Sequence, residues 1–209
     1  CRELGIEDTK VRLAQWEKLV SYIYARKGEV HIALVGKYVK LHDSYLSIVE
    51  ALNHASFVAG KNVKIKWIDS DTVTPESAPK IFEDCAGIIL PGGFGMRGIE
   101  GMINACQYAR ENHLPYFGIC LGMQILVIEF ARNVLGLKDA NSREFNEEGK
   151  HCVIDLMEGQ KGVKKGGTMR LGKYPCKVKK STLMHKAYAS DLIEERHRHR
   201  YEFSNEYRK

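Results

Sequence analysis

Phe117-Gly118-Ile119-Cys120-Leu121-Gly122-Met123-Gln124 joins a short apolar run over residues 114–119 to a helical pattern over residues 121–132. Gly-x-Cys-x-Gly at such a junction is typical of the sharp strand-to-helix turn that exposes a nucleophile, with cysteine in place of serine. The free N–H groups and positive dipole end of the helix are expected to lower the pKa of the Cys120 thiol. Taken alone, the pattern also fits a buried structural cysteine, because cysteine is common in protein cores.

A second glycine-rich turn favours the catalytic interpretation. The apolar residues 85–90 lead into Pro91-Gly92-Gly93-Phe94-Gly95. Two adjacent parallel strands whose loops meet at their carboxyl ends would form one crevice, the usual site in open α/β sheets. The backbone of Gly92 and Gly93 is therefore expected to offer N–H groups to an oxyanion beside Cys120.

The order of the predicted elements indicates the fold class. Strands are predicted over residues 30–35, 63–68, 87–90 and 114–119, and helices over residues 43–59, 75–84, 98–112 and 121–132. The alternation of residues 63–68 places that strand near a sheet edge. Asp43-Ser44 is expected to cap the first of these helices and Gly60 to end it. The βαβαβαβα order predicts an α/β fold: an open, mostly parallel, doubly wound sheet with flanking helices and right-handed crossovers.

The pattern is less regular after Gly136. We expect a strand over residues 151–156, a mobile loop over the Gly- and Lys-rich residues 158–168, a hairpin over residues 170–178 and a short helix over residues 181–188.

Composition limits the function classes. The 209 residues are 44% hydrophobic and 28% charged, which is ordinary for a globular protein. There is no run long enough to cross a bilayer and no signal-peptide pattern, so no membrane partner is expected. The six cysteines lack Cys-x-x-Cys and zinc spacing, which indicates reduced thiols, a cytoplasmic protein and no metal site. The net charge of +6 permits an anionic partner such as a nucleotide without requiring nucleic acid.

The N-terminal segment has a separate pattern. Residues 8–26 carry apolar side chains at helical spacing, and Gly28 follows as a stop. Because the chain starts at Cys1 rather than Met, we expect residues 1–28 to be a linker helix from an upstream domain. Residues 29–209 are expected to form one α/β domain.

The two glycine-rich motifs resemble those of the class I (triad) glutamine amidotransferases. Five further segments are similar, more specifically, to the glutaminase domain of the CTP synthase family: Gly36-Lys-Tyr-Val, Asp43 to Leu52, Asn141-Ser-Arg-Glu-Phe145, Gly166 to Gly172, and Glu195-Arg-His-Arg-His-Arg-Tyr-Glu202. The resemblance covers nearly all of the chain from about residue 29 onward.

This resemblance implies the chemistry and the residues that carry it. Cys120 would attack the side-chain amide of L-glutamine, releasing ammonia and leaving a glutamyl thioester. The implied oxyanion hole is Gly92 or Gly93 with the N–H of Leu121, and Arg200 would hold the substrate carboxylate. The implied substrate-binding residues are Gly93, Phe94, Leu121, Gly122, Met123, Gln124, Glu144, Arg200 and Tyr201.

The resemblance also implies partners outside this domain. The ammonia would aminate UTP to CTP in a synthetase domain that uses ATP and Mg²⁺, which this chain does not contain. The full-length enzyme would be a homo-oligomer, a tetramer. GTP is implied as an effector, with Arg170 and residues 158–168 as the places to look; no cofactor is implied in the glutaminase domain itself.

The chain departs from the family pattern in one respect. Class I amidotransferases complete the triad with a His-x-Glu pair downstream of the Arg-His-Arg-His-Arg-Tyr stretch, and the 209 residues contain no His-x-Glu. Domain 29–209 is therefore expected to lack its C-terminal end and, as given, to be a poor catalyst.

Alternative functions differ in how they explain the same residues. The nearest is the amidotransferase domain of another synthetase, and a second is a non-catalytic interaction domain with the same fold. The run of Arg and His over residues 195–202 suggests an RNA-binding module, but no aromatic platform is interleaved with it. His197 and His199 could share one strand face, but no third metal ligand is close in sequence.

Overall fold

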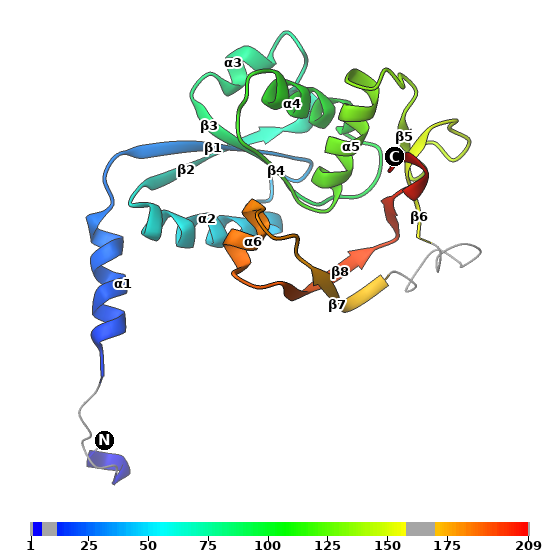
Figure 1. Cartoon of the computed structure of the whole chain (residues 1–209). Coiled ribbons are helices and arrows are strands. Elements are labelled where there is room, and N and C mark those ends of the chain that lie inside the picture. Colours follow the sequence, from blue (N-terminus) through cyan, green and yellow to red (C-terminus); the bar gives the residue numbers. More distant parts are fainter. Residues whose placement is uncertain (1, 6–11, 158–169, 209) are drawn as a thin grey trace.

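A four-stranded parallel sheet forms the centre of the computed structural model, which describes residues 2–5, 12–157 and 170–208. Its strands lie in the order β2-β1-β3-β4 (Figure 1). They are β1 (Glu29–Gly36), β2 (Asn62–Asp69), β3 (Cys85–Leu90) and β4 (Tyr116–Gly118). Neighbouring strands pair in parallel, and β2 is an edge strand, as its alternating sequence predicts. The predicted parallel α/β sheet is confirmed.

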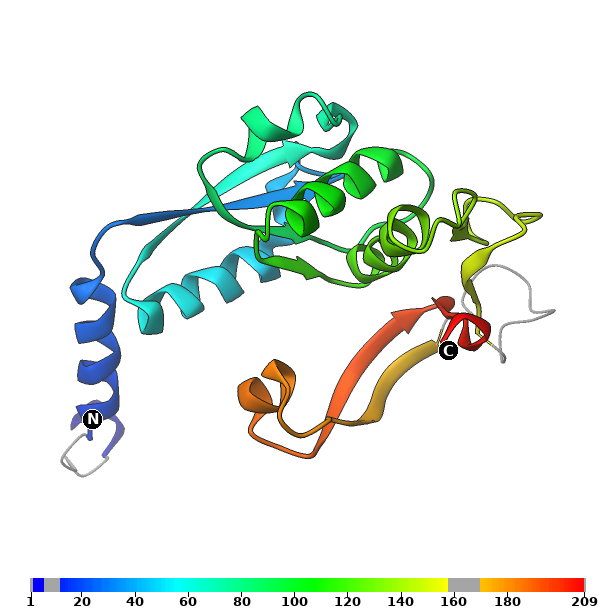
Figure 2. The same ribbon diagram turned by 45° about the horizontal axis from the view of Figure 1, so that its top comes forward.

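Helices cover both faces of this sheet. α2 (Leu46–Ala59) lies on one face, whereas α3 (Ala78–Phe82) and α4 (Ile99–Glu111) lie on the other (Figure 2). α5 (Leu121–Asn133) follows β4 and packs beside α4. The main hydrophobic core lies between the sheet and these last two helices, where Met102, Ile125 and Ile128 are fully buried. This is the doubly wound arrangement that the βαβα order predicts.

The start of α2 differs from the prediction. Residues 42–45 form a 3₁₀ turn, η2 (His42–Tyr45), and the helix begins at Leu46 without a side-chain cap. The cause is a tertiary contact: the Tyr45 hydroxyl accepts a 3.2 Å hydrogen bond from the N–H of Tyr38, which draws this turn over the end of β1. The predicted end at Gly60 is confirmed, since Gly60 adopts the left-handed conformation with φ of 64°.

Two smaller sheets follow α5. β5 (Asn141–Ser142), β6 (Cys152–Leu156) and β9 (Tyr201–Phe203) form one sheet in the order β5-β6-β9. β7 (Arg170–Lys177) pairs antiparallel with β8 (Leu192–His199), and α6 (Leu183–Tyr188) lies between them in the chain. The predicted hairpin within residues 170–178 is therefore wrong, because that segment is one continuous strand whose partner lies beyond α6. His197 and His199 do share a strand face, with ring centroids 5.4 Å apart.

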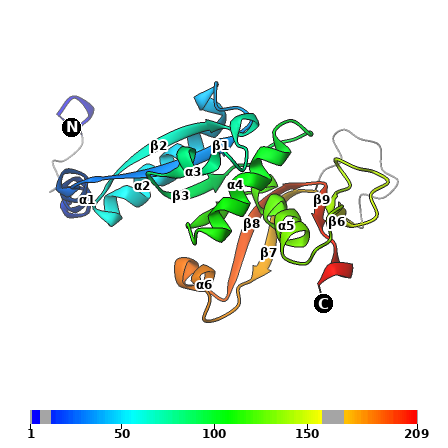
Figure 3. The ribbon, with the colours of Figure 1, turned by 90° about the horizontal axis from the view of Figure 1, so that it is seen from above.

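The N-terminal helix stands apart from the core. α1 (Ala14–Ala25) has no buried residue, and Trp16 keeps 65% of its surface exposed. Seen from above, α1 lies at the end of the molecule opposite to β6 and β9 (Figure 3). The start of the helix predicted over residues 8–26 and the loop predicted over residues 158–168 fall outside the described residues.

Candidate active site

Cys120 occupies the turn between β4 and α5, where its backbone is strained. Its φ of 55° and ψ of −105° are unusual for a residue with a side chain. The flanking glycines explain why the turn can be this tight. A Cβ on Gly118 would overlap the backbone of Gly122, and one on Gly122 would lie 2.9 Å from the carbonyl carbon of Leu90. The predicted strand-to-helix turn is confirmed, and it carries the thiol at the N-terminus of α5.

The loop after β3 lies against this thiol. A Cβ on Gly92 would stand 3.4 Å from Cβ and 3.8 Å from Sγ of Cys120, so only a glycine leaves the space beside the sulfur open. Adjacent strands β3 and β4 thus bring the two glycine-rich loops together. The N–H of Leu121, the first residue of α5, bonds to the same thiol. An oxygen that gains negative charge beside Cys120 would therefore meet backbone donors.

The electrostatics of Cys120 differ from the prediction. Burial raises the pKa of its thiol above the ordinary value, and the charge of Glu144 adds to this effect. The N–H of Leu121 and the charge of Arg198 lower the same pKa, but burial outweighs them. The predicted lowering of the pKa is therefore wrong for this chain. Removing the thiolate from water raises the pKa by more than the helix N-terminus lowers it.

Gln124 ties the first turn of α5 to the last strand. Its side chain is 5% exposed, and Nε2 donates a 3.2 Å hydrogen bond to the carbonyl oxygen of Tyr201. Next to Tyr201, the carbonyl of Arg200 accepts a 3.1 Å hydrogen bond from the N–H of Met157. Three of the predicted substrate-binding residues are therefore linked through the backbone of β9, and the Gln124 carboxamide is engaged in that link.

Glu144 reaches the site from the other side. It follows β5, and its N–H donates to the Ser142 hydroxyl over 3.2 Å. Its Oε1 accepts a 3.1 Å hydrogen bond from the N–H of Gly95, in the loop that also carries Gly92. Phe94, between these glycines, is 51% exposed, and Met123 is also exposed at the rim. The structure thus brings Glu144 and the Gly92 to Gly95 loop together.

Sequence reasoning missed two basic residues beside the Gly92 to Gly95 loop. Lys37 follows β1 directly and is 4% exposed, with Nζ bonded to the carbonyl oxygens of Phe94 and Gly95. The guanidinium of Arg198 lies 5.9 Å from the centre of the Phe94 ring. The available signal was the position of Lys37 at the carboxyl end of a buried strand, where the loops of a parallel sheet gather. For Arg198, no signal existed before the pairing of β7 with β8 was known.

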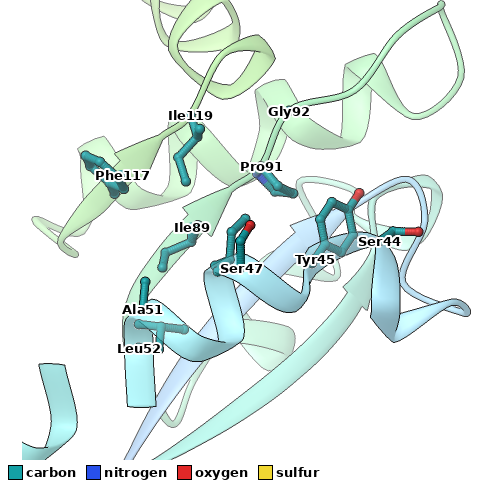
Figure 4. Close-up of a pocket in the computed structure, with 11 residues that line it drawn as sticks. Ser44, Tyr45, Ser47, Ala51, Leu52, Ile89, Pro91, Gly92, Phe117 and Ile119 are labelled. Carbon is teal, nitrogen blue, oxygen red and sulfur yellow. The ribbon is translucent and has the colours of Figure 1, made fainter. Parts of the chain in front are cut away.

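An apolar cavity of about 520 Å³ lies beside the site (Figure 4). Pro91 and Gly92 from the loop after β3 form part of its wall, and Tyr45 and Ser47 from the α2 side face them. Because Ile119, the residue before Cys120, also lines this cavity, the cavity begins next to the nucleophile. Among residues 2–5, 12–157 and 170–208 there is no group of three or more His, Cys, Asp or Glu side chains that could hold a metal ion. Within those same ranges, no helix has the length and apolarity to cross a bilayer.

Comparison with known proteins agrees with this geometry. Residues 40–209 match the family model described as glutamine amidotransferase class-I. The chain is 54% identical over 210 residues to the CTP synthase of Clostridium acetobutylicum and 55% identical over 208 residues to that of Carboxydothermus hydrogenoformans. Those matches take in 100% and 99% of this chain but 39% of each relative, so the chain spans about two fifths of their length.

The fold of this chain is also similar to that of a solved structure. The glutaminase domain of Trypanosoma brucei CTPS, solved with bound acivicin, superposes with a TM-score of 0.79 at 43% identity. The match covers 85% of this chain and 69% of that one. The chain therefore belongs to the class I glutamine amidotransferase family and, within it, groups with the glutaminase domains of CTP synthases.

Proposed function

We propose that this chain hydrolyses L-glutamine to glutamate and ammonia through a thioester on Cys120. The observation that carries the proposal is the strained turn that holds the Cys120 thiol beside Gly92 and the N–H of Leu121. The sulfur would attack the side-chain amide carbon, and the carbonyl oxygen would take the negative charge next to these donors. Breaking the carbon–nitrogen bond would release ammonia once it has gained a proton, and water would then cleave the thioester.

The remaining predicted residues would select the substrate. The carboxylate of Glu144 supplies a counter-charge for the α-ammonium group of glutamine, and the guanidinium of Arg200 suits its α-carboxylate. Gly93, Leu121, Gly122 and Tyr201 would contribute backbone contacts. These roles are proposals that rest on the chemistry of each group and on the geometry around Cys120.

We further propose that the proton carrier for turnover is an imidazole that these residues do not supply. Among the described residues, the charged side chains that act on the Cys120 thiol are Glu144 and Arg198, neither of which is a histidine. His185 is engaged with Asp191 at 2.8 Å, and His197 packs on Tyr174. A positioned acid–base group contributes roughly 10²–10⁴-fold to such a reaction. The 209-residue chain should therefore turn over glutamine that much more slowly than the longest natural polypeptide that contains it.

The partners of the whole protein are also proposed. The relatives named CTP synthase support a synthetase domain in the same polypeptide that aminates UTP to CTP with ATP and Mg²⁺. We propose a homotetramer, a cytoplasmic location and GTP as an effector. Residues 158–168, where a GTP contact was expected, and the side chain of Arg170 lie outside the described part of the structure.

The test of the proposed function is glutamate release by the longest natural polypeptide. Cys120→Ala should lower kcat by more than about 10³-fold, since the nucleophile is lost. Cys176→Ala is the matched control, because Cys176 is an exposed free cysteine on β7, away from the turn. If Cys120→Ala and wild type release glutamate equally slowly, the protein is a non-catalytic interaction domain and the proposal is wrong.

A further inference from the structure

A buried lysine holds the loop that borders the nucleophile. Lys37 is almost fully removed from solvent, which is unusual for a cationic side chain that makes no close ion pair with the described residues. Its Nζ instead donates to two successive carbonyl oxygens, 3.2 Å to Phe94 and a shorter bond to Gly95. The stem of the lysine also runs beneath the loop, where a Cβ on Gly93 would lie 3.4 Å from its Cδ.

Glu144 grips the same loop from the opposite side. The carbonyl of Phe94 and the N–H of Gly95 belong to one peptide group, and no peptide bond in the described residues is cis. In a trans peptide these two groups point in opposite directions. Lys37 donates a hydrogen bond to the carbonyl oxygen of this peptide, and Glu144 accepts a 3.1 Å hydrogen bond from its N–H. The two charged side chains therefore fix the orientation of a single peptide plane.

This grip matters because the loop would otherwise be free to rotate. Three of its five residues, Gly92, Gly93 and Gly95, lack a side chain, and glycine has the largest backbone freedom to lose. Gly95 adopts a φ of 76° with open space around it, so packing alone does not hold it there. The N–H groups of Gly92 and Gly93, which the proposed function assigns to the oxyanion, can keep a single direction only if the next peptide is held.

We infer that Lys37 is a positioning residue for glutamine hydrolysis, which clamps the Phe94–Gly95 peptide against Glu144 and so aims the oxyanion-binding loop at Cys120. The inference rests on the proposed function. Lys37 does not touch the reacting atoms; it acts through the backbone of the loop.

The charge state of Lys37 gives the clamp a pH dependence. Burial lowers the pKa of Lys37 to about 8, with Arg97 acting in the same direction and Glu144 and Asp71 opposing it. The Tyr45 hydroxyl, on the α2 side, also faces the backbone of Lys37. Below pH 8 the ammonium donates to both carbonyls, whereas above pH 8 the neutral amine holds them more weakly. The clamp should therefore loosen as the pH rises through about 8.

The first test replaces Lys37 by methionine in the longest natural polypeptide. Because a misaimed oxyanion donor costs about 10²-fold, kcat should fall by that factor while KM for glutamine stays within about threefold. Amide hydrogen exchange in the peptide that spans residues 91–97 should become about tenfold faster than in wild type. A kcat within about threefold of wild type, or unchanged exchange in this peptide, overturns the inference.

A second variant covers the case in which methionine prevents folding. Lys37→Gln keeps a neutral donor but cannot titrate, whereas Cys120 titrates in both proteins. The ratio of the variant's kcat to the wild-type kcat should therefore rise as the pH increases through about 8. A ratio that stays constant from pH 7 to pH 9 overturns the inference. The exchange measurement needs no turnover, so it still reports on the clamp if wild type releases no glutamate. A wild-type protein that releases no glutamate would instead refute the proposed function.

Discussion

The N–H of Gly95 and the carboxylate of Glu144 are joined by a 3.1 Å hydrogen bond across 49 positions of the sequence. This bond connects the loop after β3 with the segment after β5, which belong to different sheets. One carboxylate oxygen is thereby committed to the backbone, and the other accepts no hydrogen bond from the described residues. A single side chain thus both fixes the loop beside Cys120 and offers a negative charge at its rim.

Two substitutions separate these two tasks of Glu144. In Glu144→Gln the amide oxygen can still accept from Gly95, so the loop is retained and only the counter-charge for an ammonium group is lost. We expect KM for glutamine to rise about tenfold at nearly constant kcat, since a charged hydrogen bond contributes about 1.5–3 kcal/mol. Glu144→Ala should in addition lower kcat. Steady-state glutamate release measures both, and equal behaviour of the two variants would refute the dual role.

Two glycine substitutions probe the turn. Gly122→Ala places a Cβ against the backbone of Leu90, which cannot move aside cheaply, so we expect a loss of about 3 kcal/mol in the free energy of unfolding. Gly92→Ala is the matched control, because its Cβ would only reach ordinary contact with Cys120. That variant should fold like wild type yet lose turnover. Chemical denaturation followed by fluorescence gives the stabilities; a Gly122→Ala variant as stable as Gly92→Ala would contradict the tight turn.

Arg200→Ala tests the proposed contact with the substrate carboxylate. Loss of a charge-assisted hydrogen bond should cost about 2 kcal/mol, roughly a 30-fold drop in kcat/KM for glutamine. Amination of UTP from free ammonia by the full-length protein should be unaffected, since that reaction bypasses Cys120. A parallel loss of both activities would make Arg200 structural. Arg198→Ala belongs in the same series, because the charge of Arg198 lowers the pKa of the Cys120 thiol.

The raised pKa of Cys120 predicts a particular alkylation profile for the 209-residue chain. The thiolate is the reactive form, so a thiol with a pKa above its ordinary value reacts slowly at neutral pH and faster as the pH rises beyond 9. Cys106, whose pKa burial raises to about 12, should stay unlabelled over this range. Iodoacetamide labelling followed by peptide mass spectrometry measures each rate. A Cys120 rate that levels off below pH 8 would show that the helix N-terminus outweighs burial.

The parts of the fold that depend on local signals could be predicted from the sequence. Gly118 and Gly122 predict the turn, because no residue with a side chain fits at either position. The apolar run of β1 predicts a strand that is covered on both faces of the sheet. The start of α2 could not be predicted, since it depends on the hydrogen bond between Tyr38 and Tyr45. The role of Lys37 was equally hidden, because its partners Phe94 and Gly95 lie 57 and 58 residues away. The pKa of Cys120 depends on how deeply the folded chain buries it, which no motif reports.

Covalent labelling with a glutamine-derived electrophile, such as a diazo ketone, tests the central claim most directly. Full-length protein is treated with the reagent, and peptide mapping locates the adduct while glutamate release is followed in parallel. The account predicts a single adduct on Cys120, protection by excess glutamine, and loss of turnover in proportion to labelling. First labelling of Cys85 or Cys106, or full turnover by protein that is completely labelled at Cys120, would contradict it.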